Sequence, residues 1–282
     1  MSTTAHTIRA GVRRGAIESF ISLKTPGDSA FVVIGLISIG VVVWFNRSAE
    51  IMPGVPVVSF VVPSILTIQL LFIACYGLAT VIVTEREDGT LIRARSLPGG
   101  VRVYAVGVIT KTLWELVVTV GLGLVITWAI VGSSLGLDVG GVAIVLGMLV
   151  LGTIALTTFG LVLGVVFRNP RAVGGWGIIV VGALAWISGL IQPLASMAGW
   201  LQVIGQISPL YWIGVAFRSA FVPEAAQAVE LGGDWRVAVA FAVVAAWAIA
   251  GALLAPRLLR RAARRETGSA IEARREAALR RA

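Results

Sequence analysis

The charged side chains best placed to contact another protein lie together in residues 85–100, EREDGTLIRARSLPGG, here called the docking segment. Residues 57–84 before it contain no Asp, Glu, Lys or Arg. Hydrocarbon rejects a charged residue at roughly 2.5–3.5 kcal/mol on insertion scales, so the segment must lie in water or against protein. Mixed charges can pair across an interface and set its register. The candidate docking residues are Glu85, Arg86, Glu87, Asp88, Gly89, Thr90, Leu91, Arg93 and Arg95. The alternative is an ordinary solvated loop.

Two further groups could do chemistry inside the membrane. Lys111 and Glu115 are one helical turn apart, as a gating or relay pair would be, or as an ion pair that reaches toward the membrane surface. Gln69, Phe72 and Tyr76 have i, i+3, i+7 spacing and would share one helix face. That face could line a path for an amphiphilic substrate, or Gln69 could bond a neighbouring helix instead.

Several kinds of chemistry are excluded by residues that are scarce or missing. Lys24 and Lys111 are the only lysines, and neither follows the glycines of a phosphate-binding GxxxxGK[ST] loop. His6 is the only histidine and Cys75 the only cysteine, which excludes a His-rich metal site, a Ser–His pair within the membrane and an intrachain disulfide. We therefore expect no catalytic residue, metal or cofactor in this chain.

The elements that must position these residues are membrane spans. Only 13% of the 282 residues are charged, against about a quarter in a soluble domain, and 57% are hydrophobic. Stretches long enough to cross a bilayer can be read directly. We predict six spans, near residues 29–45, 59–84, 111–131, 142–167, 172–197 and 237–255. They form a body over 29–256, between an N-terminal segment (1–28) and a basic tail (257–282).

The basic residues set the expected orientation. Twenty of the 23 Lys and Arg residues fall in or beside the two terminal segments and alternate loops, and the other loops hold only Arg47, Arg218 and Arg236. Because Lys and Arg are retained on the cytoplasmic side, we expect both termini and the docking segment in the cytoplasm of a bacterium, with the chain in its plasma membrane. This distribution reports topology, so we expect no nucleic-acid partner.

Three segments outside the spans also carry patterns. Residues 5–24 have helical apolar spacing opposite basic residues, which predicts an amphipathic helix on the inner leaflet; the alternative is a frayed basic tail. Residues 199–236 are long yet apolar, and either dip back into the membrane interface or form an aromatic belt. Their singled-out residues are Pro209, Tyr211, Trp212 and Arg218. The tail is expected to be a solvated helix that touches anionic lipid.

The order of parts resembles a known family. Thr84-Glu85-Arg86-Glu87-Asp88-Gly89-Thr90-Leu91, followed by Leu97-Pro98, resembles the ER-E-x-G-T-L segment of type-two ABC exporter permeases, in particular the daunorubicin and multidrug-resistance permeases. Ser208-Pro209-Leu210-Tyr211…Phe217-Arg218 is similar to the P-L-x-Y…L-R element of that family, with Phe217 where leucine is usual. The resemblance covers nearly the whole chain.

The resemblance implies an all-α integral membrane protein with six transmembrane helices, an N-terminal interfacial helix, a cytoplasmic coupling helix in the docking segment and external re-entrant helices before the last span. It also implies two copies of a separate ABC ATPase that bind ATP and Mg, a second permease, identical or paralogous, and surrounding lipid. The cargo would be a hydrophobic or amphipathic drug, antibiotic or lipid. Rival interpretations are an ATP-independent channel or carrier, a glycan or lipid exporter of the same architecture, and an assembly or immunity protein that moves nothing.

Overall fold

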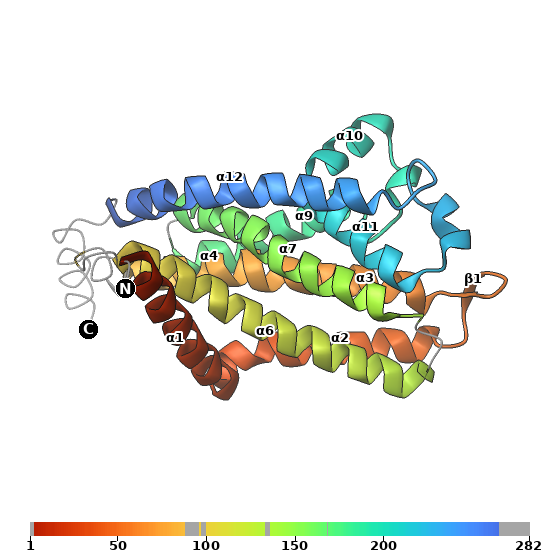
Figure 1. Cartoon of the computed structure of the whole chain (residues 1–282), viewed down its shortest axis with the longest axis horizontal. Coiled ribbons are helices and arrows are strands. Elements are labelled where there is room, and N and C mark those ends of the chain that lie inside the picture. Colours follow the sequence, from red (N-terminus) through yellow and green to blue (C-terminus); the bar gives the residue numbers. More distant parts are fainter. Residues whose placement is uncertain (1–2, 88–95, 97–99, 133–135, 168, 265–282) are drawn as a thin grey trace.

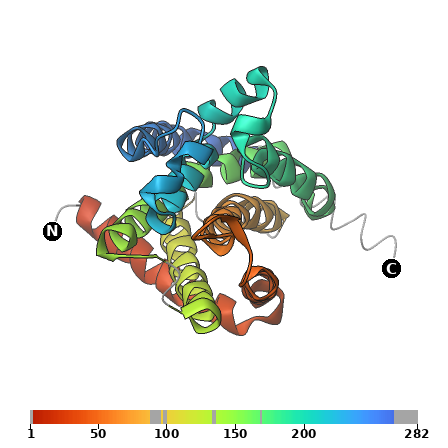
Figure 2. The same cartoon turned by 90° about the vertical axis from the view of Figure 1, so that its right-hand side faces the viewer.

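The structure is a computed structural model that describes residues 3–87, 96, 100–132, 136–167 and 169–264. It is mostly helical, as predicted, with long helices running side by side (Figure 1). A short antiparallel hairpin, β1 (Glu50–Met52) and β2 (Val55–Pro56), follows α2 (Pro26–Asn46). Seen end-on, α1 (Thr3–Lys24) and α2 lie on one side of the bundle, and α10 (Gly199–Ile207) and α12 (Val237–Arg264) on the opposite side (Figure 2).

Five helical stretches are long and apolar enough to cross a membrane. They are Val58–Arg86, Arg102–Val131, Val139–Val166, Pro170–Ile187 and Val237–Ala255. The predicted first span lies in α2, where the apolar stretch among the described residues, Val32–Asn46, is shorter. A spanning helix needs about 20 apolar residues, so the sixth span stays a prediction.

The predicted fifth span is wrong at its C-terminal end. It was expected to run to residue 197, but α9 (Ile178–Ile187) ends ten residues earlier. Gly189 has a φ of +72°, a left-handed conformation that suits glycine, and its N–H donates to the Trp186 carbonyl at 3.1 Å. The apolar residues that follow form a turn and a short 3-10 helix, η4 (Leu194–Ser196), before α10.

Other helices extend beyond the predicted spans. α6 (Gly100–Val131) begins at the end of the docking segment, well before residue 111, and α12 continues to Arg264, into the predicted tail. Residues 265–282 lie outside the described part of the chain. A helix, α1, occupies the segment where the N-terminal amphipathic helix is predicted, and its place on the inner leaflet stays a prediction.

Two spans contain a π-helical segment. The second span is one continuous helix built from α3 (Val58–Leu71), η1 (Phe72–Gly77) and α4 (Leu78–Glu87). The fifth consists of α8 (Pro170–Ala172), η3 (Val173–Gly177) and α9. A π-helix holds more residues per turn than an α-helix, so each segment rotates the side chains on one side of it relative to those on the other.

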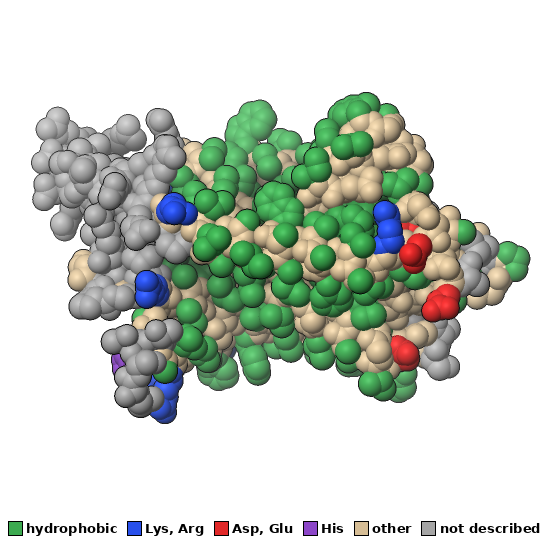
Figure 3. All heavy atoms as spheres, turned by 45° about the horizontal axis from the view of Figure 1, so that its top comes forward, with side chains coloured by type: hydrophobic (Ala, Val, Ile, Leu, Met, Phe, Trp, Pro, Cys, Tyr) green, Lys and Arg blue, Asp and Glu red, His purple; other side chains and the backbone are tan. Residues whose placement is uncertain are grey.

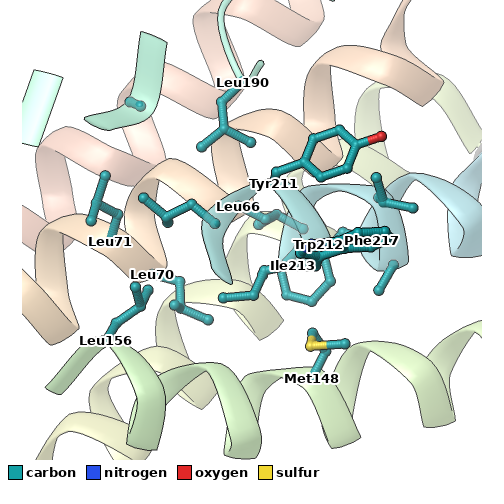
Figure 4. Packing of buried hydrophobic residues seen from close by; sticks show 14 of the residues in the cluster. Leu66, Leu70, Leu71, Met148, Leu156, Leu190, Tyr211, Trp212, Ile213 and Phe217 are labelled. Atoms are coloured by element: carbon teal, nitrogen blue, oxygen red, sulfur yellow. The ribbon is translucent and has the colours of Figure 1, made fainter. Parts of the chain in front are cut away.

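The core forms around α11 (Pro209–Phe221), which packs against α3, α7 (Val139–Val166) and α12. Ser208 caps its start by accepting from the Leu210 N–H, and Pro209 occupies the first turn, where a missing N–H costs nothing. Tyr211, Ile213 and Phe217 of α11 are fully buried in this core (Figure 4). The predicted re-entrant segment therefore contains a core helix, not only a surface belt.

The outer surface of the bundle is apolar along its middle and charged at its ends. Green apolar side chains cover the centre of the face in Figure 3, with basic side chains near one end and mainly acidic ones near the other. Large exposed apolar side chains include Trp128, Trp176, Ile179, Ile249 and Leu253. An exposed apolar area of this extent is the surface that lipid would cover.

α1 packs on α6 through small residues. Gly11, Gly15, Ser19 and Ser22 form the buried stripe. A Cβ on Gly15 would collide with the Gly107 carbonyl oxygen, so the two backbones are in direct contact. The predicted apolar face, which includes Ile8, Val12 and Phe20, is exposed and free to meet lipid. The amphipathic pattern predicted the exposed apolar face but not the face of small residues that packs on α6.

Candidate coupling site and substrate path

Glu85 connects the end of the second span to α1 and α6. Its Oε1 lies 3.9 Å from Nη2 of Arg14 on α1. Arg14 is itself held by a 2.6 Å ion pair with Glu18, and its guanidinium lies 5.0 Å from the centre of the Tyr104 ring on α6. These four side chains join three helices at the base of the docking segment.

Arg86 points to a different neighbour. Its Nη1 donates to the Gly164 carbonyl at 3.1 Å and its Nη2 to the Phe167 carbonyl at 2.9 Å, both at the C-terminal end of α7. Only 5% of Arg86 is exposed. The last carbonyls of a helix lack intrahelical partners, and a cation there also meets the negative end of the helix dipole. Arg86 thus caps α7 from the neighbouring span.

These contacts change the interpretation of the docking segment. The sequence pattern assigned Glu85 and Arg86 to a charged rim facing another protein, whereas both have partners inside the chain. Glu87 ends α4. The other docking candidates lie outside the described residues: Asp88, Gly89, Thr90, Leu91, Arg93 and Arg95. Their docking role stays a prediction.

Lys111 and Glu115 form the expected ion pair on α6. Lys111 Nζ lies 3.6 Å from Glu115 Oε1, and the side chains are 21% and 15% exposed. The pair joins successive turns of one helix, which is the geometry expected of a structural ion pair. A gating role stays a prediction.

Gln69, Phe72 and Tyr76 do not line one open face. The Phe72 and Tyr76 rings lie 5.8 Å apart in η1, but Gln69 belongs to α3 and packs on Gly35 of α2. Tyr76 instead packs on Gly177 of η3, where an added Cβ would lie 3.3 Å from the ring. The extra residue in the π-helical turn breaks the i, i+7 alignment on which the prediction depended. Gln69 and Tyr76 are both buried here, so a path along them requires the helices to separate.

A buried ion pair anchors the element that precedes the last span. Arg218 Nη2 and Nε lie 2.7 and 2.8 Å from Glu230 Oε2, and the two side chains are 6% and 7% exposed. Glu230 follows the short 3-10 helix η5 (Glu224–Val229). Sequence reasoning singled out Arg218 but missed Glu230, although an arginine in an apolar segment needs an acidic partner and this segment offers few.

Arg236 extends the cluster toward α12. Its Nη2 donates to the Tyr211 hydroxyl at 3.4 Å and to the Leu231 carbonyl at 2.7 Å, and its guanidinium lies 5.2 Å from the Trp212 ring centre. Trp212 Nε1 also donates to the Gln206 carbonyl at 2.7 Å. The predicted residues of this element are therefore brought together, as structural groups that fix α11 to its flanking turns.

Residues 28–222 match the family model described as ABC-2 type transporter. The chain belongs to this family. It is similar to the daunorubicin resistance ABC transporter permease protein DrrB1 of Streptomyces coeruleorubidus, with 27% identity over 206 residues that cover 72% of this chain and 68% of that protein. The predicted resemblance to type-two ABC permeases is confirmed.

The family match covers both elements that carried the resemblance. It extends from the start of α2 to the end of α11, so it includes the docking segment and Arg218, and it leaves α1, Glu230 and the whole of α12 outside. As an ABC-2 family member the chain is the membrane subunit of an ABC transporter, a class that works with an ABC ATPase. Among the described residues, no group of three or more His, Cys, Asp or Glu side chains could hold a metal ion.

Gln69 provides a first test of the path. Both atoms of its amide are buried, and neither has a hydrogen-bond partner among the described residues. An unsatisfied buried polar group costs about 1–3 kcal/mol, so Gln69→Leu should raise the melting temperature of the purified chain. If the amide also contacts cargo when the helices separate, the same variant should lose transport. A variant that melts earlier than the parent chain would mean that the amide has a stabilising partner.

Proposed function

We propose that this chain is the permease of an ATP-driven exporter. Two permeases, identical or paralogous, would face each other, and two ATPase chains beneath them would bind ATP and Mg and hydrolyse the nucleotide. The observation that carries this proposal is the set of contacts made by Glu85 and Arg86 at the base of the docking segment. There Glu85 is paired with Arg14 of α1, whose guanidinium lies over Tyr104 of α6, while Arg86 is bonded to α7. A force applied to the residues that follow would therefore reach helices on both sides of the second span.

The distribution of charge supports the proposed orientation. Among the described residues, most Lys and Arg lie toward the end of the bundle where the second span finishes at Arg86, whereas the connections at the opposite end hold Glu50, Asp138, Glu224 and Asp234. By the positive-inside rule the docking segment would lie in the cytoplasm with both termini, in the plasma membrane of a bacterium. An ATPase in the cytoplasm could then reach it.

The proposed cargo is hydrophobic or amphipathic: a drug, an antibiotic or a lipid. The candidate path consists of apolar and aromatic side chains with one amide, Gln69, and offers no charge to bind a polar substrate. The relative from Streptomyces coeruleorubidus is described as a daunorubicin resistance protein, which agrees with this class. ATP binding would favour one arrangement of the ATPases and so shift the permease from an inward-facing to an outward-facing state.

The experiment is co-purification of the tagged full-length chain from its host, followed by ATPase assays in lipid vesicles with daunorubicin and a panel of amphiphiles. We expect an ABC ATPase to co-purify and its activity to rise with at least one amphiphile. Leu91→Asp should release the ATPase, since it places a new charge at an apolar candidate docking residue.

The control is Arg102→Gln, which changes the charge of an exposed residue near the start of α6, close in sequence to the docking segment but outside it. It should keep the ATPase bound. Recovery of an active chain without any nucleotide-binding partner would contradict the proposal and favour an ATP-independent carrier.

A further inference from the structure

The second span lies unusually close to α7 just before it reaches Arg86. A Cβ on Gly164 of α7 would lie 2.9 Å from Ile82 Cβ, and one on Gly160 would lie 2.6 Å from the Cys75 carbonyl oxygen. Glycines one helical turn apart thus allow the two helices to approach at the backbone level. Arg86 follows Ile82 by one further turn, so its side chain begins where this contact ends.

The Arg86 guanidinium ties this contact to the end of α7. It donates to two carbonyls at once, at 3.1 and 2.9 Å, and is almost wholly buried. The planar fork of arginine suits such paired contacts, whereas a lysine ammonium is a single point charge. Apolar contacts such as Ile82 on Gly164 lack direction, so the Arg86 bonds are what fix the register of the two helix ends.

The second carbonyl, that of Phe167, belongs to the elbow between two spans. Two residues later Asn169 caps α8 by accepting from the Ala172 N–H at 2.7 Å, and Pro170 occupies the first turn. Both features fix the direction in which the next span leaves. The elbow therefore places Phe167, which Arg86 contacts, three positions before the fifth span, Pro170–Ile187.

We propose that Arg86 is a positioning residue that passes movement of the docking segment to the α7–α8 elbow and so to the fifth span. This inference rests on the proposed function, because it requires an ATPase that moves the segment. Glu85 and Arg86 then have separate roles. Glu85 keeps the end of α4 in contact with α1 and, through Arg14, with α6. Arg86 makes the elbow move together with the end of α4. Without Arg86, α4 can move while the elbow stays in place.

The test measures an intrachain distance, so the cargo need not be known. Spin labels at R13C on α1 and R171C on α8, both exposed positions, are placed in a chain with Cys75→Ala. The labelled chain is mixed with excess unlabelled chain and assembled with its ATPase in lipid. Pulsed electron resonance then compares the nucleotide-free state with ATP plus vanadate.

We expect a nucleotide-dependent shift of this distance in the parent chain and its loss in Arg86→Met. Arg86→Lys, which can reach only part of the carbonyl pair, should keep part of the shift, and Arg102→Gln should keep all of it. If Arg86→Met does not fold, Arg86→Gln is measured against the same criteria, because it keeps an amide donor but loses the charge and the fork.

Other outcomes overturn the inference. A full shift in Arg86→Met would show that the elbow moves without these hydrogen bonds. Loss of the ATPase from that variant would place Arg86 in docking instead of in transmission. A parent complex that holds its ATPase but shows no shift would contradict this inference alone, whereas a parent chain that binds no ATPase would contradict the proposed function.

Discussion

Replacing Glu230 with alanine should destabilise the protein by about 3–5 kcal/mol. The substitution leaves the Arg218 guanidinium buried without its acidic partner, and Glu230 now accepts from both Nε and Nη2 of that guanidinium. An uncompensated buried charge is among the costliest defects a single substitution can create. Thermal unfolding of the purified chain, followed by the fluorescence of its nine tryptophans, measures the effect.

Two further variants make this result specific. Glu224→Ala removes an exposed acidic side chain from the same segment and should change stability by less than about 0.5 kcal/mol. Replacing Arg218 and Glu230 together with methionine removes both charges and should recover much of the loss, since an apolar pair can substitute for a buried ion pair. Equal melting of Glu230→Ala and Glu224→Ala would mean that the pair contributes nothing.

Gly160→Ala should destabilise the contact between α7 and the second span. The new Cβ would lie 2.6 Å from the Cys75 carbonyl oxygen and 3.0 Å from that of Ala74. These are backbone atoms of η1, so the clash is relieved only when a helix moves. Overpacking of this kind costs about 1–3 kcal/mol, and here it also displaces the helix that carries the docking segment. We expect a lower melting temperature together with weaker stimulation of the ATPase.

The matched control is Gly182→Ala on α9. A Cβ at Gly182 meets nothing within 4 Å, so the substitution should be neutral or stabilising by up to about 1 kcal/mol through helix propensity. Both variants make the same chemical change in an apolar helix. Equal stability of the two would contradict the close contact at Gly160.

The spans were predictable because hydrocarbon tolerates few alternatives to an apolar helix. The residues at which the spans begin and end were less predictable. Residues 188–197 carry no charge and keep five apolar side chains, so the absence of charge places no boundary at Ile187, and the local signals are Gly189 and Pro193. α6 starts early for the opposite reason: a helix can continue into water beyond the apolar part by which it is recognised.

The contacts of the candidate site differ in how far apart their partners lie in the sequence, and this decides which of them could be predicted. Lys111 and Glu115 are close along one helix, so their ion pair follows from spacing alone. Arg86 binds carbonyl groups about eighty positions away, and a backbone acceptor leaves no mark in a sequence. The Gly11, Gly15, Ser19 stripe is readable as small residues at helical spacing, but its partner on α6 is not. Contacts within one helix could therefore be predicted from the sequence, whereas contacts between distant elements could not.

The shortness of α2 has a consequence for the surrounding membrane. Between Asp28 and Arg47 the sequence has 18 residues without a charge, which span about 27 Å at 1.5 Å per residue, against a hydrocarbon thickness of about 30 Å. Arg47 stacks on Trp44 at 3.9 Å from the ring centre and marks where the helix meets polar surroundings. If α2 crosses the membrane as predicted, this hydrophobic mismatch would be met by snorkelling of the flanking residues or by a local dimple in the bilayer, beside the span that carries Gln69. The elastic cost of such a dimple would rise with acyl-chain length, so we expect lipid thickness to act on this permease without occupying any site.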